Sequence, residues 1–167
     1  MKAIMAVAAF ALAIGNAQAR LRWTMGDCEN VWGAPVDVRY NGKIDQTCYT
    51  FVSSKKLAVI VYLLNGQVQS VNYCSRDARF LVNNVRQLLQ KNCSGAWNLY
   101  DDGRGKQTYA TWNYKNSDGE MIAYALLYNN PNAGGWYRMQ VSTSLWDAYL
   151  ADHNARGFSP DTNGLNV

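Results

Sequence analysis

Alternating apolar and polar positions predict β-strands in two groups along the chain. In the first group, three runs are rich in Val, Ile, Leu, Tyr and Thr: residues 47–53, 56–64 and 67–74. Asn65-Gly66 between the last two runs predicts a two-residue hairpin turn, because both positions tolerate a positive φ. In the second group, four runs alternate with period two: residues 96–101, 107–115, 119–128 and 135–142. The pattern therefore predicts a three-stranded meander followed by a second antiparallel set.

Helical spacing of apolar residues marks three further segments: residues 23–32, 76–91 and 144–153. The middle segment is the clearest, since Leu81, Val85 and Leu88 recur three and four positions apart. Ser75 is expected to cap its N-terminus. Gly33 is expected to end the first helix, because glycine accepts the left-handed conformation found after helices.

The order of these elements predicts an α+β fold built from tandem helix-plus-antiparallel-meander units, α-β3-α-β4-α. We expect one disulfide-stapled domain in two halves, with a loose polar tail after it: residues 20–155, divided into 20–74 and 75–155, and residues 156–167. The segments Cys28–Gly33 and Cys93–Asn98 each precede a meander and carry a Trp four positions after the Cys. This correspondence suggests an internal repeat.

The first nineteen residues have the layout of a secretory signal peptide. Lys2 provides the positive charge, and residues 3–14 form an unbroken apolar run. Ala17-Gln18-Ala19 supplies the small residues that precede a cleavage site. The run is shorter than the roughly twenty residues of a membrane-spanning helix, and no Cys follows that could carry a lipid anchor. We expect export, cleavage after Ala19, and a secreted or periplasmic product without a membrane anchor.

Four cysteines follow the predicted cleavage site: Cys28, Cys48, Cys74 and Cys93. An even number of cysteines in an exported chain predicts two disulfide bonds. Three pairings are possible, and we favour Cys28–Cys48 with Cys74–Cys93, because each pair then closes a loop of about twenty residues. None of the spacings is that of a redox motif or a zinc site.

The composition argues against several classes of function. The formal net charge of +4 is mild, and no run of Lys or Arg indicates a nucleic-acid or membrane-surface site. The one histidine, His153, is too little for a catalytic triad or a histidine-rich metal centre. We therefore expect no metal, no cofactor and no catalytic residues, and we consider an enzyme less favoured than a binding protein.

Carboxylates provide the alternative, a small secreted hydrolase acting on cell-wall glycans. Such an enzyme needs two carboxylates that face each other across a cleft. The candidates are Asp101, Asp102, Glu120 and Asp147. Nothing in their spacing along the chain places two of them together.

Aromatic residues are the most conspicuous surface candidates, since the chain has six Trp and eleven Tyr. They crowd the strands of the second group, where neighbours such as Trp136 and Tyr137 must point to opposite sides of the sheet. Exposed Trp and Tyr would form a platform for a protein or a sugar; alternatively, they fill cross-strand pairs. The expected binding residues are Tyr109, Trp112, Tyr124, Tyr128 and Trp136, with Arg138 as a charged neighbour.

The first half resembles the unit of the β-lactamase-inhibitory-protein-like group and of the related small outer-membrane-assembly lipoproteins. The residues that carry the resemblance are Trp32-Gly33-Ala34-Pro35, Cys48-Tyr49-Thr50-Phe51, Leu57–Leu64, Asn65-Gly66 and Gln67–Tyr73. The resemblance implies two tandem units that bind an enzyme on an aromatic-rich sheet. The segment before Cys28 is too short for the usual pair of opening helices, and Cys74–Cys93 would join the units. A cystatin-like or NTF2-like fold fits the second half about as well.

The combined expectation is an exported, non-enzymatic binding protein that inhibits or neutralises a protein partner. Carbohydrate is a further candidate ligand for the aromatic residues. Besides the hydrolase, a secreted effector and an envelope assembly module remain alternatives, because such proteins are also small, exported and poor in catalytic motifs.

Overall fold

The computed structural model describes residues 20–101, 108–128, 130–132, 134–155, 158, 160–162 and 165. The side chains of residues 101, 108 and 109 lie outside this description, as does the predicted signal peptide at residues 1–19. Among the helices of the described residues, none is long and apolar enough to cross a membrane.

Within the described residues the chain forms three helices and eight strands. In chain order they are α1 (Met25–Trp32), β1 (Asp37–Asn41), β2 (Gln46–Ser54), β3 (Leu57–Leu64), β4 (Gln67–Ser75), α2 (Ala78–Asn92), β5 (Trp97–Asp101), β6 (Thr108–Lys115), β7 (Met121–Tyr128), β8 (Tyr137–Thr143) and α3 (Ser144–Asp152). The α+β class is thus confirmed, with one strand, β1, that the sequence pattern did not predict.

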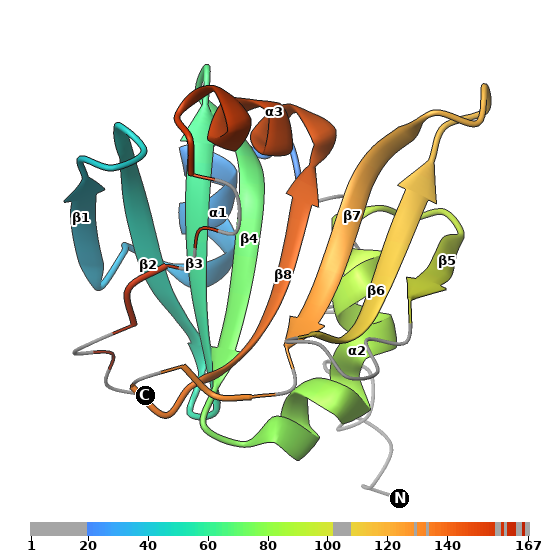
Figure 1. The fold of residues 1–167 in the computed structure, drawn as a ribbon. Helices are drawn as coiled ribbons and strands as arrows, with labels where there is room; N and C mark the ends of the chain where they lie inside the picture. The colour runs from blue at the N-terminus through green and yellow to red at the C-terminus, as the bar shows by residue number, and fades with distance from the viewer. Residues whose placement is uncertain are drawn as a thin grey trace, which may run out of the picture.

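All eight strands form one antiparallel sheet in the order β1-β2-β3-β4-β8-β7-β6-β5. The first four strands and the last four each form a meander, and β4 pairs with β8 where the two meanders meet. β1 and β5 are the edge strands. Figure 1 shows α1 and α2 on one side of the sheet, which we call the inner face, and α3 with the C-terminal segment on the other, the outer face.

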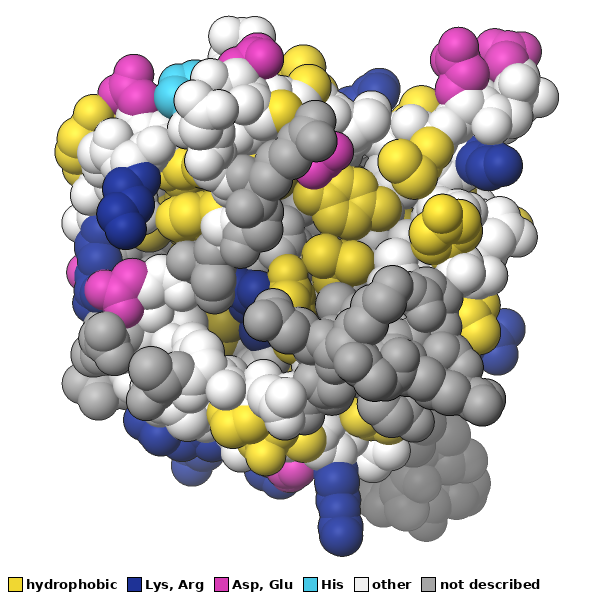
Figure 2. Space-filling view, in the orientation of Figure 1, with side chains coloured by type: hydrophobic (Ala, Val, Ile, Leu, Met, Phe, Trp, Pro, Cys, Tyr) yellow, Lys and Arg dark blue, Asp and Glu magenta, His cyan; other side chains and the backbone are white. Residues whose placement is uncertain are grey.

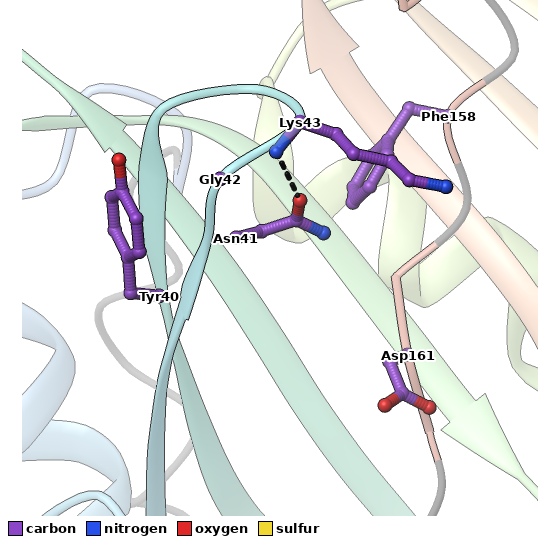
Figure 3. A pocket seen from close by; sticks show the side chains of 6 residues that line it. All are labelled: Tyr40, Asn41, Gly42, Lys43, Phe158 and Asp161. Carbon is purple, nitrogen blue, oxygen red and sulfur yellow. Dashed lines mark hydrogen bonds between the residues drawn. The ribbon is translucent and has the colours of Figure 1, made fainter.

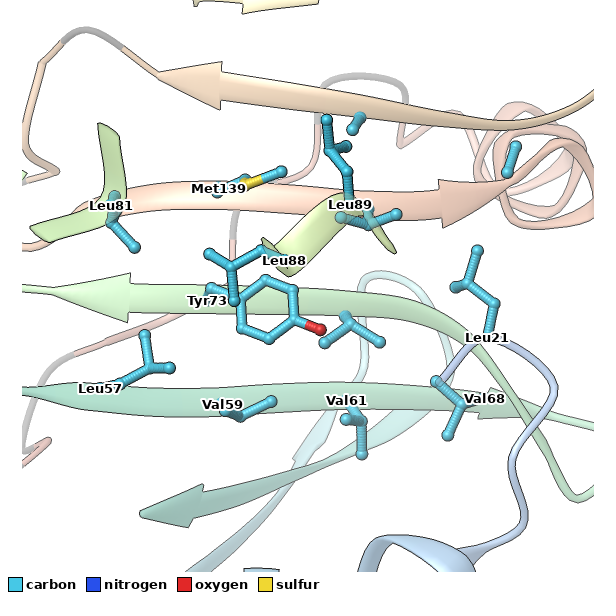
Figure 4. Close-up of a cluster of buried hydrophobic side chains, with 14 of the residues drawn as sticks. Leu21, Leu57, Val59, Val61, Val68, Tyr73, Leu81, Leu88, Leu89 and Met139 are labelled. Atoms are coloured by element: carbon cyan, nitrogen blue, oxygen red, sulfur yellow. The ribbon is translucent and has the colours of Figure 1, made fainter. Parts of the chain in front are cut away.

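The larger core lies between the inner face and the first two helices. Figure 4 shows Leu57, Val59 and Val61 of β3 beneath Leu81 and Leu88 of α2, all of them buried. Burying one such side chain stabilises the fold by about 1.5–3 kcal/mol. The apolar residues that recur at helical spacing in α2 therefore do attach that helix to the sheet.

A hydrogen-bonded cluster lies within this core. Tyr73 Oη accepts hydrogen bonds from Arg20 Nη1 at 3.1 Å and from Asn92 Nδ2 at 2.8 Å. The Arg20 guanidinium also lies over the rings of Trp32 and Tyr73. Because all three polar side chains of the cluster are buried, these bonds replace the water that folding removed.

A smaller core lies on the outer face, under α3 and the C-terminal segment. Trp146 of α3 packs against Tyr62 of β3 with ring centres 5.0 Å apart, and Leu150 and Leu165 belong to the same cluster. Leu165 and Thr162 are buried. The expectation of a loose tail is therefore wrong at these two residues, because the chain after α3 returns to the sheet and covers part of it.

The N-terminus of α2 is capped two residues later than expected. Asp77 accepts hydrogen bonds from the backbone N–H groups of Arg79 and Phe80, at 3.0 and 3.3 Å. Ser75 is the last residue of β4, and its hydroxyl accepts from the Asp77 N–H instead. The strand therefore continues further than the sequence pattern showed, and the helix begins at Ala78.

Candidate functional site

The outer face of β6 and β7, beside α3, forms a groove that we call the aromatic groove. It encloses about 400 Å³ and is lined by Tyr100, Thr111, Trp112, Asn113, Lys115, Met121, Tyr124 and Asp147. Figure 2 shows this face of the molecule, with hydrophobic side chains gathered beside α3. Tyr100 and Met121 are exposed at the groove, so its rim is apolar as well as its wall.

Strand pairing and helix capping place the groove residues. Asn113 and Tyr124 lie directly opposite each other across the β6–β7 ladder and therefore point to the same face. Thr143 ends β8 and caps α3, accepting a hydrogen bond from the Trp146 N–H at 3.2 Å. The helix therefore begins at the end of the sheet, and its first turn brings Asp147 to the groove.

Polar side chains continue along the outer face next to Tyr124. The Tyr124 hydroxyl is hydrogen bonded to Ser142, and burial raises the pKa of Tyr124 to about 12. Ser142 also lies 2.8 Å from the Ser70 hydroxyl and accepts from Gln140 Nε2 at 3.0 Å. These bonds fix the position of Tyr124, so its ring is a rigid wall of the groove.

Tyr128 and Arg138 form the next part of this surface. The Tyr128 hydroxyl donates to Gln140 Oε1 at 3.3 Å, and the Arg138 guanidinium lies 3.9 Å from the centre of the Tyr128 ring. Tyr128 is half-buried, whereas Arg138 is buried. Arg138 therefore holds the ring of its neighbour rather than presenting a charge to solvent.

Asn113 contributes a buried acceptor at the groove. Its Oδ1 atom has no hydrogen-bond partner within the part of the chain that the structure describes. A buried acceptor without a donor costs about 1–3 kcal/mol. Because the atom is buried, the groove does not present it to a ligand in this conformation.

The predicted binding residues lie in different parts of the structure. Tyr124 and Trp112 line the groove, and Tyr128 lies on the same face as Tyr124, four positions further along β7. The side chain of Trp112 also packs against the inner core. The side chain of Tyr109 lies outside the described residues.

Trp136 does not belong to an exposed platform, and this expectation is wrong. Its side chain is 1% exposed and forms part of the outer core. Arg76 covers the ring, with its guanidinium 4.6 Å from the ring centre. Trp136 is buried because the turn before β8 folds under this arginine, whose Nη1 donates to the Gly134 carbonyl at 3.4 Å.

Five groove residues were not among the predicted site residues: Tyr100, Thr111, Asn113, Lys115 and Met121. Asn113 follows Trp112 in a strand of alternating residues, so the predicted period of two already implied that it occupies the opposite face. The sequence lacked the information that α3 stands beside that face. Tyr100 lies in a bulged edge strand, where the alternation is irregular.

The carboxylates proposed for a hydrolase do not gather in the described part of the molecule. Asp147 lines the groove, whereas Glu120 accepts a hydrogen bond from Asn116 Nδ2 at 3.1 Å in the β6–β7 turn. The side chain of Asp101 and the whole of Asp102 lie outside the described residues. Among the described residues there is also no cluster of His, Cys, Asp and Glu that could bind a metal ion.

A second, wider hollow of about 740 Å³ lies beside the turn between β1 and β2. Figure 3 shows Lys43, Phe158 and Asp161 around it, with the Lys43 N–H bonded to Asn41 Oδ1 at 2.9 Å. The turn and the C-terminal segment form its walls. Its lining includes the polar side chains of Asn41, Lys43 and Asp161.

All four cysteines are free thiols in the structure. Cys28 and Cys93 pack with the inner core, and Cys48 and Cys74 belong to the outer core. The favoured pairs, Cys28–Cys48 and Cys74–Cys93, would each join opposite faces of the sheet, so this fold does not permit that pairing. Two disulfide bonds remain a prediction without an assigned connectivity.

Comparison with known proteins assigns no family. No family model matches the chain, and no curated protein matches it. Among solved structures, the chain is similar to a cysteine-rich secretory protein from Staphylococcus aureus, with 12% identity and a TM-score of 0.40. The match covers 88% of this chain and 49% of that protein, so the chain spans about half of its length. The chain is therefore assigned to no family on these grounds.

Proposed function

We propose that this protein is an exported, non-enzymatic binding protein that neutralises a protein partner held at the aromatic groove. The observation that carries the proposal is the groove itself, an apolar-rimmed hollow with a hydrogen-bonded floor. Tyr, Trp and Met are enriched at protein interfaces because they offer large contact areas. Tyr100, Met121 and Tyr124 provide such an area on one face.

Rigidity supports a binding role for this surface. Tyr124 is fixed through Ser142, and Tyr128 is fixed through Gln140 and Arg138. Side chains that are already immobile lose little conformational entropy when a partner binds, and this raises affinity.

We further propose that the two halves are repeats of one helix-plus-meander unit, as in the β-lactamase-inhibitory-protein-like group. A helix followed by four strands occurs twice along the chain, as α1 with β1–β4 and α2 with β5–β8. The sheet order places the last strand of each unit side by side. In this arrangement the groove lies on the second unit.

The proposal predicts that capture of the partner depends on the groove. The mature chain, immobilised, is exposed to an envelope extract of its source, and stoichiometric partners are identified by mass spectrometry. Tyr100→Ser removes exposed apolar area at the groove, and Val82→Ser removes an exposed apolar side chain from α2, away from the groove. We expect the first substitution to abolish capture and the second to leave it unchanged. Equal capture by the two variants would contradict the proposal.

A further inference from the structure

The edge strand β1 carries a row of exposed apolar side chains. Val38 and Tyr40 of the strand are 53% and 67% exposed, and alternation places both on its inner-face side; Val36, immediately before the strand, is 63% exposed. Such values are unusual for large apolar side chains on a sheet edge, which proteins commonly protect with charges. Val31 of α1, also exposed, lies on the same side of the sheet.

The other side of the same strand is charged and balanced. Arg39 Nε lies 2.5 Å from an Asp37 carboxylate oxygen, and Arg39 Nη1 lies 3.3 Å from Asp161 Oδ2. β1 pairs with β2 along one edge, and Figure 1 shows it as the last strand at its end of the sheet. In the described part of the chain, its other edge therefore presents backbone N–H and C=O groups without a strand partner.

We propose that a second copy of this chain pairs antiparallel with β1, so that the two sheets become continuous across a two-fold axis at Val38. Antiparallel pairing about Val38 sets Asp37 opposite Arg39 of the second copy, and Arg39 opposite its Asp37. On the inner-face side, Val36 then lies opposite Tyr40 of the second copy. The strand is thus complementary to itself in both charge and apolar character.

Neighbouring registers lose this complementarity. An axis at Asp37 or at Arg39 would oppose two like charges, and like charges directly opposite each other are unfavourable. An axis between two residues would place apolar side chains opposite charged ones. Pro35 and Gly42 lie on either side of the strand and limit pairing to these few residues. The register at Val38 is therefore the one that the sequence of β1 favours.

A second copy explains this edge better than a strand of another protein. A symmetric pair needs one surface that complements itself, and β1 is such a surface. Pairing of β1 with the β5 edge of another copy would instead build an open-ended chain of molecules. Each added copy would leave a free edge strand to which a further copy could pair. Tyr40 is also held in place for packing, since its hydroxyl donates to Asp45 Oδ1 at 2.6 Å.

Sedimentation equilibrium of the mature chain tests the proposal. We expect a dimer with a dissociation constant below about 100 µM, as for a small interface. Val38→Lys puts two ammonium groups against each other at the axis and should give a monomer. Leu99→Lys makes the same change on the β5 edge and should leave the dimer intact.

Charge reversal tests the register. Asp37→Arg alone opposes two arginines at two symmetric positions and should weaken the dimer by about tenfold. The double variant Asp37→Arg with Arg39→Asp restores opposite charges and should restore the affinity. A wild-type chain that remains monomeric at about 100 µM, a dimer broken by Leu99→Lys but not by Val38→Lys, or a double variant as weak as the single one would overturn the proposal.

Discussion

The Arg138 guanidinium covers the face of the Tyr128 ring at 3.9 Å, and the two residues come from the paired strands β8 and β7. A cation over an aromatic face is stabilised by about 2 kcal/mol or more when it is desolvated. Arg138 is buried, so this contact is of the stronger kind. The floor beside the aromatic groove is therefore part of the folded core.

Replacement of the ring should reveal this contribution. Tyr128→Leu keeps an apolar side chain but removes the aromatic face and the hydroxyl that donates to Gln140. We expect a loss of about 2 kcal/mol in the free energy of unfolding, measured by urea denaturation. Tyr100→Leu, at an exposed position, serves as the control and should change stability by less than about 0.5 kcal/mol.

The hydroxyl of Tyr73 should contribute more to the stability of the fold than its position in an apolar core suggests. Tyr73→Phe leaves the Arg20 and Asn92 side chains without the acceptor that they share. Each buried donor left unpaired costs about 1–3 kcal/mol, so we expect a loss of about 2–4 kcal/mol. Tyr40→Phe removes a hydroxyl from an exposed hydrogen bond and should cost far less. Equal losses in the two variants would show that the buried cluster is not stabilised through this hydroxyl.

Substitution of Trp136 should lower the stability of the fold without affecting binding of the partner. Trp136→Ala removes a fully buried ring from the outer core and should destabilise the fold by about 3–5 kcal/mol. At a temperature where the variant is still folded, partner capture should equal that of the wild type. A stable variant that no longer captures the partner would show that Trp136 belongs to the binding surface.

The sequence predicted those features that depend on local chemistry. Asn65 and Gly66 form the expected turn with φ values of 52° and 75°, because Asn and Gly both tolerate the positive φ that this turn requires. The missed strand β1 has only five residues, and two of them are charged. Its pairing with β2 depends on the tertiary fold, which a local pattern does not contain.

The site could be predicted only in part, for the same reason. Alternation correctly separated Trp112 from Asn113, but it could not say which face α3 and the C-terminal segment would cover. Trp136 therefore looked like a surface residue until the position of Arg76 was known. The favoured pairing of the cysteines does not fit the fold for a similar reason. It rested on short loops along the chain, and loop length does not reveal that a sheet lies between two thiols.

The reactivity of the cysteine thiols should decrease as their burial increases. Cys93 is half-buried, whereas Cys28 and Cys74 are fully buried, and burial raises the pKa of these two thiols to about 12. Since the thiolate is the reactive form, we expect a thiol reagent at pH 8 to modify Cys93 first and the other cysteines only after unfolding. Digestion and mass spectrometry identify the modified residue. A chain that reacts with none of its cysteines even when unfolded would show that disulfide bonds have formed.

Alkaline pH should destabilise the protein partly through Tyr124. Burial raises the pKa of Tyr124 to about 12, the hydrogen bond to Ser142 lowers it in part, and Asp147 raises it further. An unfolded tyrosine ionises near pH 10, so the unfolded state loses this proton first. The stabilising contribution is therefore complete below about pH 10 and is lost as the pH rises towards about 12.

The variant Tyr124→Phe isolates this contribution. It should cost about 1 kcal/mol at neutral pH, because the hydrogen bond to Ser142 is lost. Between about pH 10 and 12, its free energy of unfolding should fall less steeply than that of the wild type, by about 2 kcal/mol over the interval. Tyr100→Phe changes an exposed hydroxyl and should reproduce the wild-type slope. Identical slopes for wild type and Tyr124→Phe, measured by denaturant titration at each pH, would mean that Tyr124 ionises as readily in the folded protein as in the unfolded chain, and that its ring is not held in the groove by Ser142.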